Sequence, residues 1–146
     1  MALALALSQK IPYTKFPNGD GFTYRAVFDA YIGLPKKGAI RSKKIESITD
    51  SGANDCIFHA QIGESVGFDV KSGRMSETFG VDGKASTIYF HDMFLYAPGG
   101  AMTINAAFSY DLPVAGILGM NGFFEHFKIT FDPTMLRCEL ERLFHA

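Results

Sequence analysis

A carboxylate, a hydroxyl and a glycine follow one another at Asp50-Ser51-Gly52, and Ala53 comes next. Asp and Ser side chains hydrogen-bond to nearby backbone groups and favour turns, while Gly adopts backbone angles that other residues avoid. A carboxylate on such a turn is held rigidly and remains accessible, so it can take part in proton transfer. An ordinary Asp-Ser-Gly turn is the alternative interpretation, because short motifs often match by chance.

The segment that precedes this loop, residues 44–49, has to position it. Ile45, Ile48 and the β-branched Thr49 favour an extended strand. The sequence therefore predicts that Asp50 lies on a tight loop at the end of a strand.

A second apolar stretch covers residues 114–121 and contains Ile117-Leu118-Gly119. This compact run predicts a short strand that ends at the glycine. The Phe-rich residues 121–127 that follow predict one short helix.

A hairpin is predicted between these two stretches. Residues that favour strands, at 75–81 and 84–95, flank Asp82-Gly83. Asp-Gly between two strands is typical of a type I′ turn, which needs positive φ at both central residues. Gly80, just before the turn, adds backbone freedom near the tip.

The rest of the chain is predicted to consist of short strands and tight turns. Residues 8–21 contain two prolines and two glycines and are predicted to be irregular, whereas 22–34 is predicted to be one long strand. One or two helical turns are predicted at 60–66, and 135–144 fits either a strand or a helix. With 14 Phe and 15 Gly, the composition favours short strands joined by tight turns.

One domain is expected from the length of 146 residues. We assign residues 1–21 to an N-terminal extension and residues 22–146 to the domain. The net charge of −1 lacks the basic character of nucleic-acid-binding proteins, so no nucleic-acid partner is expected. Residues 1–7 are apolar but too few to span a membrane. They are expected to form a strand or a docked terminus, or to be a remnant of processing or of an added tag.

Cysteine and histidine usage indicates neither a disulfide framework nor a metal site. Cys56 and Cys138 could pair, but a chain of this size does not require it, and reduced thiols are the default. The four histidines show no spacing typical of metal ligands. We therefore predict no metal and no cofactor, and a soluble protein for which the cytoplasm is favoured.

The order of these features resembles the retropepsin-like aspartic proteases. That family carries an Asp-Thr/Ser-Gly loop followed by Ala or Ser, then a flap hairpin, then an apolar-apolar-Gly strand before a short helix. The matching residues are Asp50, Ser51, Gly52 and Ala53, a flap around 78–85, and Ile117, Leu118 and Gly119. The sequence departs from the family at Thr49, where an apolar residue is usual, and at the flap tip, which is not the familiar glycine-rich one.

The resemblance implies an all-β, closed β-barrel with a flap hairpin and one short helix, acting as a homodimer. Peptide hydrolysis by such a protease needs two carboxylates that share one proton, because like charges a few ångströms apart cannot both ionise. The chain has a single Asp-Ser/Thr-Gly. The second carboxylate would therefore be Asp50 of a second copy across a two-fold axis.

The resemblance also implies roles for individual residues. Asp50 would activate the water and protonate the leaving amide, and Ser51 would brace the loops across the dimer. Gly52 would let a backbone carbonyl face the substrate, and Ala53 would line the floor. Candidates for the flap and the substrate-binding walls are Met75, Phe79, Gly80, Val81, Asp82, Gly83, Ile117, Leu118 and Gly119.

The function predicted in this way is endopeptidase hydrolysis of extended peptides by a water activated between the two copies of Asp50, with an acidic to mildly acidic optimum. An alternative of another class is a catalytically silent protease-like domain used for dimerisation or peptide binding. A third interpretation is a β-barrel for a small ligand, in which Asp50-Ser51-Gly52 is only a turn.

Overall fold

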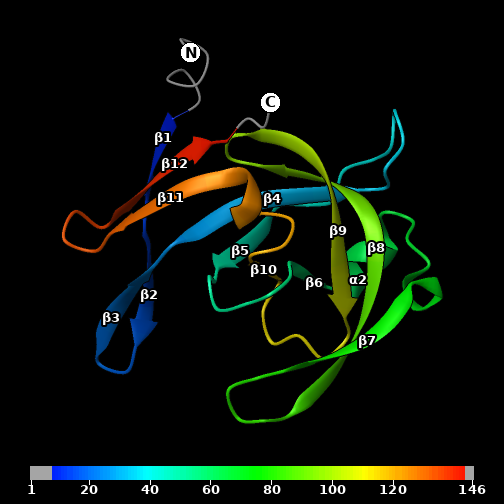
Figure 1. Cartoon of the computed structure of the whole chain (residues 1–146). Helices are drawn as coiled ribbons and strands as arrows, with labels where there is room; N and C mark the ends of the chain where they lie inside the picture. The colour runs from blue at the N-terminus through cyan, green and yellow to red at the C-terminus, as the bar shows by residue number, and fades with distance from the viewer. Residues whose placement is uncertain (1–7, 144–146) are drawn as a thin grey trace.

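The main feature of the computed structural model, which describes residues 8–143, is a closed barrel of six strands (Figure 1). In the order in which they pair, the strands are β4 (Val27–Gly33), β5 (Ile45–Thr49), β10 (Gly116–Leu118), β6 (Ile57–His59), β9 (Gly100–Ser109) and β8 (Ala85–Ala97). The barrel closes because β4 also pairs with β8. A further strand, β7 (Arg74–Phe79), pairs with the other part of β8. The predicted all-β, closed-barrel fold is confirmed.

Large apolar side chains fill the interior of the barrel. Fully buried examples are Phe28, Phe58, Phe108, Phe123, Ile32, Leu95 and Leu118. Phe123 connects two parts of this core, with its ring centroid 5.9 Å from that of Phe28 and 4.8 Å from that of Phe127. The interior of the barrel is therefore a packed core.

The two ends of the described chain meet in a separate three-stranded sheet. Its order is β1 (Ser8–Pro12), β12 (Arg137–Arg142) and β11 (Phe127–Asp132), so β12 is the central strand. Both pairings are antiparallel, with Ile11 opposite Cys138 and Phe131 on the other side of the same residue. Of the two structures predicted as alternatives for residues 135–144, the strand forms, over residues 137–142.

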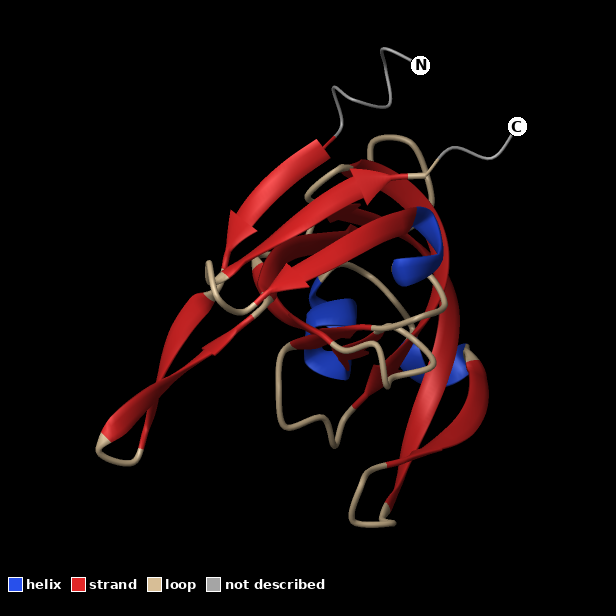
Figure 2. Ribbon diagram, turned by 60° about the vertical axis from the view of Figure 1, so that its left-hand side comes forward, coloured by secondary structure: helices blue, strands red, loops and turns tan. Residues whose placement is uncertain are grey.

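A two-stranded hairpin lies in the chain between β1 of this sheet and β4 of the barrel, and we call it the arm. It consists of β2 (Thr14–Asn18) and β3 (Gly21–Arg25), and β2 and β3 pair only with each other among the described strands. Figure 2 shows the arm extending away from the barrel. Its two-residue turn uses Gly19 at a φ of 60°.

The prediction that residues 8–21 are irregular is wrong, because they contain β1 and β2. Two prolines are tolerated in these strands. Pro12 is the last residue of β1. Pro17 lies in the arm, where each strand has one unpaired edge that needs no N–H donor. The single strand predicted over residues 22–34 is instead two strands, β3 and β4, interrupted at Ala26.

The α-helix within residues 8–143 is α2 (Ala60–Ser65), which confirms the helical turns predicted at 60–66. The helix predicted over 121–127 is only a 3-10 turn, η2 (Phe124–His126). Gly122 has a φ of 96°, which prevents a helix from starting earlier. A second 3-10 turn, η1 (Val70–Ser72), precedes β7. No helix of the described chain combines the length and the apolar character that a membrane crossing needs.

The β7–β8 hairpin forms where it is predicted, but its turn differs. Type I′ needs positive φ at Asp82 and Gly83, and only Gly83 has it, at 78°. Gly83 N–H donates to Gly80 O at 3.0 Å, and Gly80 N–H donates to Lys84 O at 3.1 Å. The tip is therefore a three-residue loop closed by a left-handed glycine, a common hairpin connection.

Candidate active site

The loop that carries Asp50 begins where β5 ends. Asp50 N–H donates to Leu118 O at 2.9 Å, and Asp50 O accepts from Ala53 N–H at 3.1 Å. The carboxylate itself accepts a hydrogen bond from Gly52 N–H, with 2.8 Å between Oδ1 and N. Asp50 is exposed, so one carboxylate oxygen fixes the turn while the group remains accessible to a substrate.

Strand β10 lies parallel to β5 and brings the second apolar stretch beside this loop. Ile117 is in register with Ile48, and Leu118 with Thr49. Beyond the strand, Met120 N–H donates to Ala53 O at 2.9 Å, which ties the two loops together. Two segments far apart in sequence are therefore adjacent in the fold.

Gly119 allows this close approach. A Cβ atom at Gly119 would lie 2.4 Å from Asp55 O and 2.7 Å from Ala53 O, both backbone atoms. Real Cβ atoms do not come so close to backbone oxygens, so a larger residue would force the Asp50 loop to move.

A cavity of about 520 Å³ lies between the Asp50 loop and the β7–β8 hairpin. Of the predicted site residues, it is lined by Asp50, Gly52, Ala53, Phe79, Gly80, Val81 and Ile117. The other predicted residues do not line it: Ser51, Met75, Asp82, Gly83, Leu118 and Gly119. Leu118 is fully buried in the core, whereas Met75 is exposed on β7.

Sequence reasoning missed several residues that line this cavity. Its apolar walls include Ile57, Ile88, Phe90 and Leu112, and its carboxylates besides Asp50 are Asp55, Glu77 and Asp111. The sequence around Ile88 favours a strand, but it does not indicate which face of that strand is turned toward Asp50. The cavity therefore combines apolar walls with several acidic groups.

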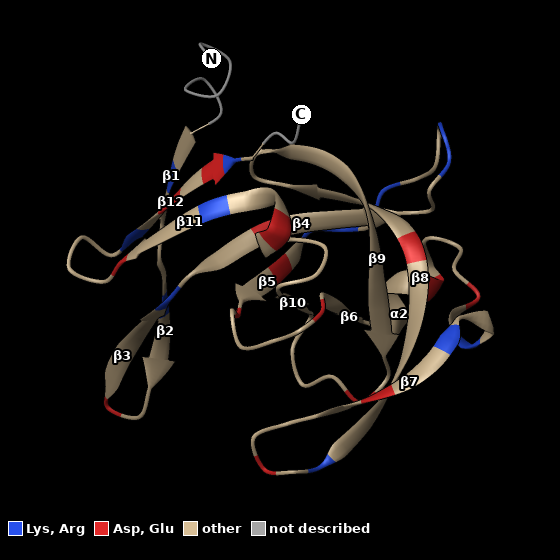
Figure 3. Cartoon of the chain, viewed as in Figure 1, with Lys and Arg blue, Asp and Glu red and all other residues tan. Residues whose placement is uncertain are grey.

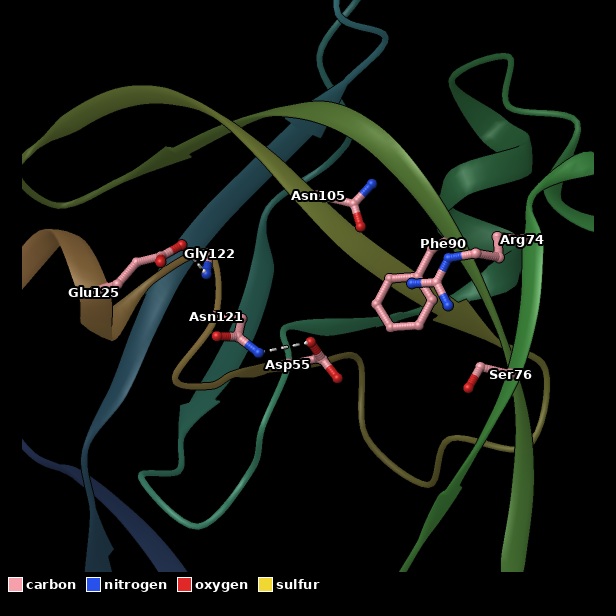
Figure 4. A pocket seen from close by; sticks show the side chains of 8 residues that line it. All are labelled: Asp55, Arg74, Ser76, Phe90, Asn105, Asn121, Gly122 and Glu125. Atoms are coloured by element: carbon pink, nitrogen blue, oxygen red, sulfur yellow. Dashed lines mark hydrogen bonds between the residues drawn. The ribbon is translucent and has the colours of Figure 1, made fainter.

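A neighbouring pocket of about 480 Å³ shares Asp55, Ser76 and Phe90 with this cavity. Figure 4 shows its side chains: Asn121 Nδ2 donates to Asp55 Oδ1 at 3.3 Å, and the Arg74 guanidinium lies 4.3 Å from the Phe90 ring centroid. Because the lining is shared, the two spaces form adjoining parts of one surface depression. The neighbouring pocket continues the cavity toward η2, which contributes Glu125, and it provides both acidic and basic groups.

Thr49, the residue before Asp50, has a structural partner. Its N–H donates to Ala26 O at 3.1 Å, and its hydroxyl Oγ1 donates to the same oxygen at 2.9 Å. Ala26 separates β3 from β4, so Thr49 joins the end of β5 to the base of the arm. A polar residue at this position therefore has a physical reason, although most members of the resembling family carry an apolar one.

Replacing Thr49 with Val should lower the free energy of unfolding by about 1 kcal/mol, the net contribution of a hydrogen bond. Val keeps the shape and the backbone hydrogen bond but removes the hydroxyl. Urea denaturation at neutral pH measures the loss. Thr103→Val, on an exposed position of β9, is the matched control and should change stability by less than about 0.5 kcal/mol. Equal effects of the two changes would contradict this role.

The two cysteines are both buried and unpaired with each other. Cys56 lies just after the Asp50 loop, and its Sγ accepts a hydrogen bond from Gly119 N–H at 3.5 Å. Burial raises the pKa of the Cys56 thiol to about 12, an effect that the Gly119 hydrogen bond partly offsets. Burial also raises the pKa of Cys138 to about 11. Both groups remain neutral thiols at physiological pH.

This pKa shift predicts a loss of stability at high pH. The unfolded Cys56 thiol ionises near 9, while the folded pKa is about 12. The stabilisation is therefore complete below pH 9 and is lost as pH rises toward the folded pKa. Urea midpoints measured from pH 8 to 11 should fall more steeply for the wild type than for Cys56→Ala. Parallel slopes for the two proteins would refute the assignment.

The histidines near this region have structural partners. His59 Nδ1 accepts from Gln61 N–H at 3.1 Å and caps α2, and His91 Nε2 contacts Val70 O at 2.8 Å. Across residues 8–143, no three His, Cys, Asp or Glu side chains gather in a way that could hold a metal ion.

Comparisons with known proteins find similarity in structure and not in sequence. No family model matches the chain, and no curated protein has a matching sequence. A retropepsin-like aspartic protease from Rickettsia conorii is 19% identical and superposes with a TM-score of 0.59, over 92% of this chain and 97% of the other. EIAV protease complexed with the inhibitor HBY-793 is 16% identical over 72% of this chain and 88% of the other, with a TM-score of 0.49. The likeness to the Rickettsia conorii protein shows that this chain has a retropepsin-like fold.

Proposed function

We propose that the chain is an aspartic endopeptidase whose active site forms between two copies, with Asp50 of each supplying one carboxylate. One observation carries the proposal: Asp50 is accessible at the wall of the 520 Å³ cavity, on a loop fixed by Gly52 and by the neighbouring strand β10. The retropepsin-like fold supports it.

The reaction follows from two carboxylates that share one proton. The ionised carboxylate removes a proton from a water molecule, whose oxygen forms a bond to the scissile carbonyl carbon. The protonated carboxyl gives its proton to the carbonyl oxygen. The amide nitrogen then accepts a proton from the dyad and the C–N bond breaks. As the tetrahedral intermediate collapses, one of its hydroxyl groups returns a proton to the dyad, and a carboxylic acid and an amine are released. The two groups need a common proton, which favours an acidic to mildly acidic optimum.

The β7–β8 hairpin would act as the flap of this enzyme. Its residues Phe79, Gly80 and Val81 line the cavity above the Asp50 loop. The apolar walls formed by Ile57, Ile88 and Ile117 suit the side chains of an extended peptide. Backbone groups of the hairpin would bind the peptide main chain in the manner of an added strand.

A catalytically silent domain that dimerises or binds peptides is the second candidate. The residues around Asp50 that depart from the resembling family, Thr49 and the flap tip 80–83, are the observation that favours it. The barrel for a small ligand is disfavoured, because buried side chains fill the barrel interior.

Two measurements on the wild-type protein test the proposal. Sedimentation should show a concentration-dependent dimer. A peptide library incubated with the protein between pH 3 and 8 should be cleaved, and a pepstatin-type inhibitor should prevent this cleavage. A folded dimer that cuts no peptide at any pH would support the silent domain. A strict monomer at high concentration would overturn the shared dyad.

A further inference from the structure

The loop between β4 and β5, residues 34–44, carries a concentration of positive charge, and we call it the basic loop. It contains no aspartate or glutamate. Five of the chain's 14 lysines and arginines lie in it: Lys36, Lys37, Arg41, Lys43 and Lys44. All five are exposed. Figure 3 shows the lysine-bearing tip of this loop extending beyond the strands of the barrel.

Most of these cations have no carboxylate partner. Lys44 Nζ lies 3.9 Å from Glu46 Oε1, and within residues 8–143 this is the one ion pair that the basic loop makes. The Arg41 guanidinium lies 3.8 Å from the ring centroid of Tyr96. A guanidinium stacked on an aromatic ring keeps N–H groups available for a carboxylate or a phosphate. Uncompensated positive charge therefore remains on the loop.

Three carboxylates on the strands beside the basic loop reduce this charge. Asp29 and Glu46 are opposite each other on β4 and β5, and Asp92 lies on β8. All three belong to strands of the barrel, whereas Lys36 and Lys37 lie in the turn at the tip of the loop. A surface that approached this tip from solution would meet the lysines before the carboxylates.

An exposed isoleucine lies among the cations. Ile40 is 78% exposed. The backbone close to it is fixed, because Ser42 N–H donates to Ile32 O at 2.8 Å and Ser42 Oγ accepts from Ile32 N–H at 3.0 Å. Ser42 is buried, so these bonds hold the basic loop to β4. The fold therefore presents an apolar side chain to solvent next to unpaired cations.

An anionic surface with an apolar layer beneath it suits this combination. Acidic lipid headgroups attract lysine and arginine, and the acyl chains below them accept an apolar side chain. Nucleic acid is a weaker fit, because the chain's pI of about 6.4 lacks the basic character of nucleic-acid-binding domains. A phosphate backbone also offers no apolar contact to Ile40. We propose that the basic loop docks the protein on anionic lipid headgroups at a membrane surface.

The rest of the charge distribution favours this orientation. The basic loop and the β7–β8 hairpin lie at opposite ends of the molecule (Figure 1). Among residues 8–143, no lysine or arginine lines the cavity beside that hairpin, which has four carboxylates: Asp50, Asp55, Glu77 and Asp111. Arg74 and Lys84 on the hairpin offset this charge only in part. An anionic membrane would therefore attract the basic loop more strongly, and the cavity would face the solution.

Binding through so few cations is reversible and depends on salt. One lysine or arginine near an anionic membrane strengthens partitioning about fivefold, and salt screens this attraction. The wild-type protein should sediment at low salt with vesicles of phosphatidylcholine and phosphatidylglycerol. It should sediment much less with phosphatidylcholine alone, and added NaCl should release it. No binding to the anionic vesicles at low salt would overturn the proposal, whether or not the protein cleaves peptides.

Charge removal at the tip locates the contact. Lys36→Gln combined with Lys37→Gln should lower the partition coefficient at least tenfold, because two cations next to the headgroups are lost. The matched control, Lys71→Gln combined with Lys128→Gln, removes two exposed lysines from η1 and β11. It should change binding by less than about threefold, since charges far from the surface are screened. Equal losses in the two variants would overturn the assignment to the basic loop.

Ile40→Ser distinguishes a bilayer from other anionic partners. It should weaken vesicle binding about tenfold, because the apolar side chain no longer leaves water. Phe22→Ser, which removes an exposed apolar side chain from the arm, should leave binding unchanged. Unchanged binding of Ile40→Ser would overturn the lipid contact. Binding to a DNA duplex in place of vesicles, lost in Lys36→Gln with Lys37→Gln, would overturn it in favour of nucleic acid. Circular dichroism confirms that each variant is folded.

Discussion

Peptide cleavage should fall about 10²- to 10⁴-fold when Asp50 is replaced with Asn, the range expected for loss of general acid–base catalysis. The amide oxygen of Asn can still accept the hydrogen bond that Gly52 N–H donates to Oδ1 at 2.8 Å. The loop should therefore keep its shape, while the amide can neither take a proton from water nor deliver one to the leaving nitrogen. In the proposed homodimer the same chain supplies both halves of the site, so one substitution removes both carboxylates.

Initial rates on a peptide cut by the wild type measure this effect, with circular dichroism and sedimentation to confirm fold and association. Asp111→Asn is the matched control, because Asp111 is an exposed carboxylate that lines the same cavity. We expect it to retain cleavage within about tenfold, since the proposed dyad does not include Asp111. Full activity of Asp50→Asn would rule out the dyad.

The second large effect is expected from Gly119→Ala, which should destabilise the protein by about 3 kcal/mol. The new Cβ would lie 2.4 Å from Asp55 O and 2.7 Å from Ala53 O. Both oxygens belong to the backbone, and Ala53 O already accepts the hydrogen bond from Met120 N–H. The clash is relieved only if β10 and the Asp50 loop separate. Cleavage should therefore fall together with stability.

Thermal and urea unfolding measure this change. Gly21→Ala is the control, because the nearest atom to a Cβ at Gly21 is Asn18 O at 3.8 Å, an ordinary contact, and its φ lies outside the left-handed region. We expect the control to change stability by less than about 1 kcal/mol. If Gly119→Ala were as stable as the control, the close approach of the two loops would not require glycine at position 119.

The strand and the turn that hold Asp50 could be predicted because the residue types within each of these segments favour its structure. Ile45 and Ile48 followed by Asp50-Ser51-Gly52 predict a strand and a turn, and β5 ends at Thr49. The pairing of β10 with β5 is different. Ile117 lies 67 positions after Asp50, and no local sequence pattern determines which strands pair. Only the resemblance to a family pointed to their association.

The secondary-structure predictions that the structure contradicts also have local causes. Pro12 and Pro17 suggested irregular structure, yet both lie where a strand needs no N–H donor. Asp82-Gly83 suggested a two-residue turn, but the bond from Gly80 N–H to Lys84 O closes a longer loop. The Phe-rich residues 121–127 suggested a helix with one apolar face, whereas the positive φ of Gly122 delays the helical turn to Phe124.

The position of β12 has a consequence for the order in which the protein acquires its structure during synthesis. β12 is the central strand of its sheet, so β1 and β11 cannot join that sheet before residues 137–142 exist. At ordinary elongation rates, β1 leaves the ribosome on the order of ten seconds before its partner. Cotranslational folding can therefore build the barrel first, while the sheet that unites the two ends of the chain closes last.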